Sequence, residues 1–132
     1  MKNILCLFLC LLMTCSCRGK ESEPLSSPSG ECTIKTAISG EEAGETRRFC
    51  VKLIFIETKS KKELSCQTGA SDYQKWAVGW SPKNVLILYS SDIGTFAYEI
   101  VDGKINERMA TNEEKELGKD FYKNKYGRRP SH

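Results

Sequence analysis

The chain has 132 residues, of which 39% are hydrophobic and 28% charged, and its formal net charge is +3. This length suits one domain with a modest core, and 20 basic against 17 acidic residues give no global basic surface, so we expect no nucleic-acid partner. The only histidine is His132, the last residue, which excludes Ser–His and Cys–His catalytic pairs and histidine-based zinc sites.

The first 17 residues, MKNILCLFLCLLMTCSC, have the layout of an export signal. One charge at Lys2 precedes an uninterrupted apolar run from Ile4 to Met13, and small residues follow. A bilayer-spanning helix needs about 20 apolar residues, so this run is too short for a permanent span. We therefore predict that residues 1–16 are a signal peptide that is removed.

The cysteine at the end of this segment resembles the acceptor cysteine of bacterial lipoprotein signals. Cys17 follows Ser16, a residue type that this signal favours before the cut, whereas Thr14 three places before Cys17 is a weak match. Cys15 has the favoured Leu12 at that place but follows Thr14. The resemblance implies acylation, including palmitate-type chains, at Cys17, with Cys15 as the alternative. No aspartate follows either cysteine, which implies sorting to the outer membrane with the protein facing the periplasm.

The segment after the signal is rich in serine, proline, glycine and charge. Residues 18–30 read RGKESEPLSSPSG, and such a composition buries too little apolar surface to fold. We predict a flexible tether over residues 17–30 and a single globular domain over residues 31–132.

Short segments rich in β-branched and aromatic residues, separated by polar turns, dominate the domain. They predict an antiparallel sheet or meander of about six strands. The strand candidates are residues 32–38, 47–58, 63–68, 73–80, 84–90 and 95–101, with 104–109 as a candidate for a last short strand.

One helix is predicted at the C-terminal end. Thr111 and Glu114 form a capping box, and Gly127 is placed to end the helix. Lys123 and Lys125 oppose the negative end of the helix dipole. An apolar stripe consists of Leu117, Phe121, Tyr122 and Tyr126, and Gly118 weakens the helix interior. The predicted fold class is therefore α+β, with a small antiparallel sheet and one C-terminal helix.

The segment from Trp80 to Ile100, WSPKNVLILYSSDIGTFAYEI, resembles one hairpin of a TolB-type β-propeller blade. A propeller needs at least four blades and the chain has one copy, so the resemblance implies only a hairpin, with Trp80 packing and Pro82 setting the turn. We expect Trp80 to be buried and to anchor this hairpin against Leu117 and Phe121 of the helix.

Three cysteines, Cys32, Cys50 and Cys66, lie beyond the signal. An odd number in an oxidising compartment favours one disulfide and one free thiol, and Cys50–Cys66 is the preferred pair because they lie in successive strands. If Cys15 were the acylated residue, Cys17 would be a fourth cysteine available for pairing, and the number of such cysteines would be even. Three cysteines alone form an incomplete metal site, so we expect no metal and no cofactor.

Carboxylate pairs occur at Glu41–Glu42 and Glu113–Glu114, and the turn at Ser90, Ser91 and Asp92 is the most polar in the chain. Acids in turns and first helical turns are typical of solvated surface, so no catalytic residue is assigned. The basic helix tail, with Tyr122 and Tyr126 between its charges, either contacts an anionic surface or is a solvated helix end.

Together these features predict a membrane-anchored envelope lipoprotein that acts by binding another envelope protein, as an immunity protein, an inhibitor or an accessory subunit. One alternative is a small cell-envelope hydrolase that uses Asp92 and a glutamate. The other is a purely structural lipoprotein.

Overall fold

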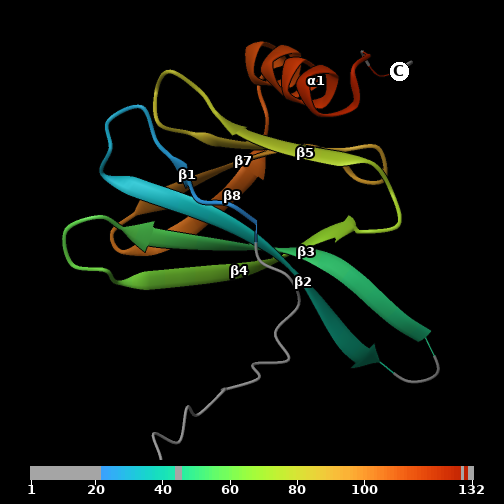
Figure 1. The fold of residues 1–132 in the computed structure, drawn as a ribbon, viewed down its shortest axis with the longest axis horizontal. Helices are drawn as coiled ribbons and strands as arrows, with labels where there is room; N and C mark the ends of the chain where they lie inside the picture. The colour runs from blue at the N-terminus through green and yellow to red at the C-terminus, as the bar shows by residue number, and fades with distance from the viewer. Residues whose placement is uncertain (1–21, 44–45, 129, 131–132) are drawn as a thin grey trace, which may run out of the picture.

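A computed structural model describes residues 22–43, 46–128 and 130, with side chains outside 39–48. Two antiparallel four-stranded sheets and one C-terminal helix form three layers (Figure 1). The predicted class, an antiparallel α+β fold that is mostly sheet, is confirmed. The expected count of about six strands is wrong, because the described residues form eight strands in two sheets.

The strands follow one another through each sheet in chain order. The first sheet contains β1 (Leu25–Ser26), β2 (Cys32–Ala43), β3 (Thr46–Glu57) and β4 (Glu63–Ser71). The second contains β5 (Trp76–Trp80), β6 (Leu86–Ser90), β7 (Gly94–Val101) and β8 (Lys104–Met109).

The first sheet begins inside the segment predicted as a tether. β1 pairs with β2, with Leu25 opposite Ile34, and Ser27 is buried. Upstream, the Ser22 amide donates to the Thr36 carbonyl at 2.9 Å, and the Thr36 amide donates to Ser22 Oγ at 2.8 Å. The structure therefore places residues 22–30 in the domain, and residues 1–21, including the predicted signal, lie outside the described residues.

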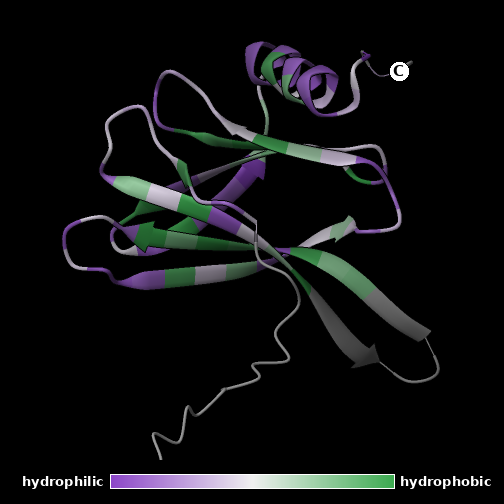
Figure 2. Cartoon of the chain, viewed as in Figure 1, coloured by the Kyte–Doolittle hydropathy of each residue, from purple (hydrophilic) through white to green (hydrophobic). Residues whose placement is uncertain are grey.

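The main core lies between the two sheets. Alternate residues of β2, β3 and β4 face alternate residues of β5, β6 and β7, as the period of two in a strand requires. The buried members of this inter-sheet cluster are Ile34, Val51, Leu53, Phe55, Ala70, Leu86, Leu88 and Tyr98. Figure 2 shows hydrophobic residues along the strands and mostly hydrophilic ones on the helix.

The helix α1 (Asn112–Tyr126) covers the other face of the second sheet (Figure 1). The predicted capping box is confirmed, because Thr111 Oγ1 accepts from the Glu114 amide at 3.2 Å and the Glu114 carboxylate accepts from the Thr111 amide at 2.9 Å. Gly127 ends the helix in the left-handed conformation, with φ of 77°.

Two glycines allow the helix to approach the sheet closely. A Cβ at Gly118 would lie 3.1 Å from Thr95 Cγ2, and one at Gly79 would lie 2.6 Å from the Phe121 ring. Gly118 therefore has a packing role that offsets its low helix propensity.

The expected contact of Trp80 with the helix is wrong. Trp76 and Trp80 do share one face of β5, but that face looks toward the first sheet. Ala77 and Gly79, on the opposite face, meet the helix through Tyr122 and Phe121. Trp80 is partly buried and joins the two sheets instead.

Candidate functional site

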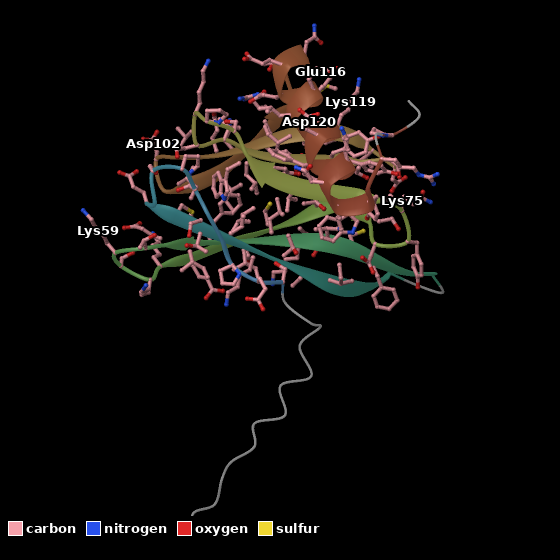
Figure 3. All side chains as sticks on the ribbon, turned by 45° about the horizontal axis from the view of Figure 1, so that its top comes forward. Lys59, Lys75, Asp102, Glu116, Lys119 and Asp120 are labelled. Atoms are coloured by element: carbon pink, nitrogen blue, oxygen red, sulfur yellow. The ribbon has the colours of Figure 1, made fainter. Side chains whose placement is uncertain are left out.

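A cavity of about 800 Å³ opens at one end of the sandwich, where turns of both sheets meet. Figure 3 shows Lys59, on the turn between β3 and β4, and Asp102, on the turn between β7 and β8, at this same end. The side chains and backbone that line it come from Ser27, Ser29, Gly30, Glu31, Cys32, Phe55, Glu57, Thr58, Lys59, Lys62, Leu64, Trp80, Asn84, Tyr98, Glu99, Ile100 and Gly103.

Aromatic side chains form the inner wall of this end cavity. The rings of Phe55 and Trp80 meet edge to face, with centroids 6.3 Å apart and planes at 80°. The Trp80 indole N–H donates to the Leu25 carbonyl at 3.0 Å, which fixes the ring. The aromatic wall is therefore built by residues of both sheets.

Tyr98 lines the same cavity from the middle of the second sheet and is fully buried. Burial raises the pKa of Tyr98 far above its usual value, and the neighbouring Glu107 carboxylate raises it further, through its interaction with the hydroxyl and through its negative charge. The hydroxyl therefore stays protonated at physiological pH.

Hydrogen bonds between turns hold the rim of the cavity. Thr58 donates from its amide to the Glu31 carbonyl at 3.0 Å and from its hydroxyl to the Gly30 carbonyl at 2.7 Å. The Ser29 amide donates to Asn84 Oδ1 at 2.9 Å, and Asn84 itself has a φ of 61°. These bonds join three turns from both sheets, so the rim is preformed.

Charges of both signs surround the apolar wall. Glu31, Glu57, Lys59 and Lys62 are all exposed residues that line the opening. A pocket of several hundred Å³ with an apolar wall and a few polar groups is typical of a binding site. This arrangement can receive an apolar side chain and pair the charges that flank it.

The predicted lipidation residues, Cys17 and Cys15, lie outside the described residues, as does His132. Cys32, Cys50 and Cys66 are free thiols. The register places Cys50 opposite Ser71, and Cys66 opposite Leu53. Cys66 belongs to the inter-sheet cluster, whereas Cys50 does not, so the structure does not bring the expected pair together.

Two of these thiols are poorly suited to reaction. Burial raises the pKa of Cys66 to about 11, and the nearby Glu107 contributes to this shift. Burial also raises the pKa of Cys32. Because the thiolate is the reactive form, both side chains behave as small core residues at neutral pH.

In the polar turn at Ser90 to Asp92, the side chains accept hydrogen bonds from backbone amides. Ser90 Oγ accepts from the amides of Asp92 and Ile93 at 3.1 and 3.4 Å, and Asp92 Oδ2 accepts from the Ser71 amide at 3.4 Å. In the described part of the chain, no group of three or more His, Cys, Asp or Glu side chains is arranged to hold a metal ion.

The basic helix tail is partly engaged in the fold. Lys125 Nζ lies 3.5 Å from the centroid of the Trp76 ring and donates to the Trp76 carbonyl at 2.8 Å. Tyr126 Oη accepts from the Trp76 amide at 3.2 Å. Burial lowers the pKa of Lys125. This end of the helix is therefore clamped to the edge strand β5, while Lys123 and Arg128 stay exposed.

Comparison with known proteins gives no family for this chain. No family model matches it, and neither a curated protein nor a solved structure is significantly similar. Over the described residues, the structure contains no helix with the length and apolar character needed to cross a bilayer.

Sequence reasoning missed the end cavity because its residues are scattered over six segments without a shared motif. The available signals are indirect: the basic turn TKSKK over residues 58–62, and residues 27–30, which the composition predicts as part of the tether. Neither shows which other turns lie beside it.

Proposed function

We propose that the protein is a lipid-anchored lipoprotein of the cell envelope that binds another envelope protein at the end cavity. Within this class, an immunity or inhibitor role is the favoured form. The observation that carries the binding role is the preformed end cavity, with aromatic residues in its wall and charges of both signs at its rim.

The cavity has the composition of a recognition site for a protein loop. Aromatic side chains at the centre of a contact contribute most of the binding energy in protein complexes, and charged rims set specificity and association rate. Here Trp80 and Phe55 lie inside, while Lys59, Lys62 and Glu57 lie outside. A partner that inserts one apolar side chain, flanked by charges, fits this layout.

The anchor is supported by the N-terminal segment, with its ten-residue apolar run and Ser16 before Cys17. Two acyl chains suffice for stable attachment, since each buried methylene contributes about 0.8 kcal/mol. Intact mass of the purified protein should show a mature chain that starts at Cys17 and carries about three acyl chains. A mature chain that starts at Cys15 would move the acylation site from Cys17 to Cys15. An unlipidated mature chain would overturn the anchor.

Binding at the cavity is tested by a photo-crosslinking amino acid at position 59, at the rim, or at position 115, on the exposed side of α1. In living cells, position 59 should give one discrete crosslinked product and position 115 should not. With the crosslinking residue at position 59, the charge reversal Lys62→Glu should abolish this product. The matched reversal Lys123→Glu on the helix should leave it intact.

Two results would overturn the binding proposal. One is equal crosslinking at both positions. The other is release of fragments from labelled cell-wall material by the purified protein, lost in Glu57→Gln or Asp92→Asn, which would establish the hydrolase alternative.

A further inference from the structure

The chain joins the folded domain at a defined point. Ser22 is held to Thr36, in the middle part of β2, by hydrogen bonds of 2.8 and 2.9 Å. Only five residue steps separate Ser22 from Cys17. Fully extended, five residues span about 18 Å at most, so an acyl group on Cys17 would keep Ser22 within that distance of the membrane surface.

This reach is short compared with the thickness of the domain. Stacked sheets lie about 10 Å apart, and a helix adds a layer about 10 Å thick. The solvent side of α1, where Figure 3 shows Glu116, Lys119 and Asp120, is therefore more than ~20 Å from the first sheet. The short connection therefore favours an orientation in which the first sheet, and not this side of the helix, lies next to the membrane.

We infer that the outer face of the β1–β4 sheet is the membrane-facing surface of the protein, and that α1 faces away from the lipid. This inference rests on the proposed lipid anchor. It goes beyond that anchor by assigning an orientation to the domain.

The chemistry of the outer face fits phospholipid head groups. Because Ile34, Leu53 and Cys66 face the core, strand alternation puts their neighbours on the outer side. Lys35 and Ser65 flank Ile54 there, and Lys52 lies beside Gln67. Lys61 lies on the turn between β3 and β4 at the same sheet. Lysines with long apolar stems are suited to an interface with anionic lipid.

The orientation also determines how the basic helix tail and the end cavity lie relative to the membrane. The basic helix tail is turned away from the head groups, so it does not serve as a membrane contact. The end cavity lies at the ends of the strands and opens sideways, close to the lipid surface. A partner must reach it along the membrane.

The test uses the full lipidated chain in vesicles of phosphatidylethanolamine and phosphatidylglycerol that contain a head-group nitroxide lipid. A fluorescent amino acid replaces Ser65 on the outer face of β4 or Glu116 on α1, both exposed positions. Quenching should be at least about threefold stronger at position 65 than at position 116, since nitroxide quenching needs close approach. Inserting 20 Gly/Ser residues after Glu21 should largely remove this difference.

The outcomes separate the two proposals. A chain that floats with the vesicles and has the lipidated mass, but is quenched equally at both positions or more at position 116, overturns the orientation alone. An unlipidated mature chain overturns the anchor, and the orientation with it. A difference that persists unchanged after the insertion also contradicts the short connection as its cause.

Discussion

Trp80 is the residue at which both sheets and the N-terminal strand meet. Its ring contacts Phe55 across the sandwich, and its indole N–H satisfies the Leu25 carbonyl. Removing the Trp80 side chain would therefore weaken three things together: the inter-sheet core, the attachment of β1 and the wall of the end cavity.

We predict that Trp80→Ala lowers the free energy of unfolding by about 3 kcal/mol, near the lower end for a buried aromatic because the ring is only partly buried. Urea denaturation followed by circular dichroism measures this. Tyr73→Ala is the control, since Tyr73 is 77% exposed and should change stability by less than about 0.5 kcal/mol. Equal effects of the two substitutions would contradict the packing role of Trp80.

Glu114 combines a helix cap with an ion pair. Its carboxylate accepts hydrogen bonds from Arg108 at 2.6 and 2.9 Å and from the Thr111 amide at 2.9 Å. The Arg108 bonds are the main cause that lowers the pKa of Glu114 from 4.5 to about 2, with the Thr111 bonds adding to them against the opposing effect of burial.

Because the folded pKa lies below the unfolded one, the ionised Glu114 stabilises the fold above about pH 4.5 and loses this effect as the pH falls toward about 2. We predict that Glu114→Gln costs about 2 kcal/mol at pH 7 and that its difference from the wild type shrinks as the pH falls from 5 to 2.5. Denaturation at a series of pH values measures this difference. Glu113→Gln, which replaces an exposed acid in the same helical turn, is the control and should cost clearly less stability at pH 7.

At the level of elements, the contact between α1 and the second sheet depends on two small residues. Gly79 leaves room for the Phe121 ring, and Gly118 leaves room for the side chains of Thr95 and Tyr89. The helix contributes Phe121 and Tyr122 to the clusters on this face, so close approach is what buries them.

We predict that Gly79→Ala destabilises the protein by about 2 kcal/mol, because its Cβ would lie 2.6 Å from the Phe121 ring. Gly69→Ala is the matched control in β4, where the nearest atom to the new Cβ is 3.7 Å away. Thermal melts of both variants give the comparison. Adding Phe121→Leu should restore part of the stability lost in Gly79→Ala, and no restoration would contradict the clash.

The helix could be predicted from sequence, whereas the layer that it contacts could not. Thr111, Glu114 and Gly127 act within one or two turns, so their spacing alone specifies the start and the end. The period of two in a strand puts Trp76 and Trp80 on one face of β5. It does not show which face meets the helix, because both faces of the second sheet are covered.

At the scale of the whole molecule, the boundary of the domain depends on polar residues. Ser27 is 5% exposed, and its amide and hydroxyl bond to Cys32, at 2.8 and 3.2 Å. Buried serine gives no hydrophobic signal, so composition predicted a tether where the structure has a strand. The cavity was hidden for a related reason: its rim is made by turns that only tertiary structure brings together.

A chain that begins at Ser22 should therefore keep the stability of the mature protein, whereas one that begins at Glu31 should not. Loss of β1 removes the bonds to Thr36, Cys32 and Trp80, and we expect a melting temperature lower by about 10 °C or more. Differential scanning calorimetry of the two chains tests this. Equal melting temperatures would show that residues 22–30 contribute nothing to the fold.

The order of strands in the two sheets also has a kinetic consequence. Within each sheet, every strand pairs only with strands that are next to it in the chain, so each pairing is closed by a short connection. Loop closure then costs little entropy at each step, which favours fast folding for a protein rich in sheet. Residues 25–71 supply one sheet and residues 76–109 the other, so each sheet is built from one continuous stretch of chain.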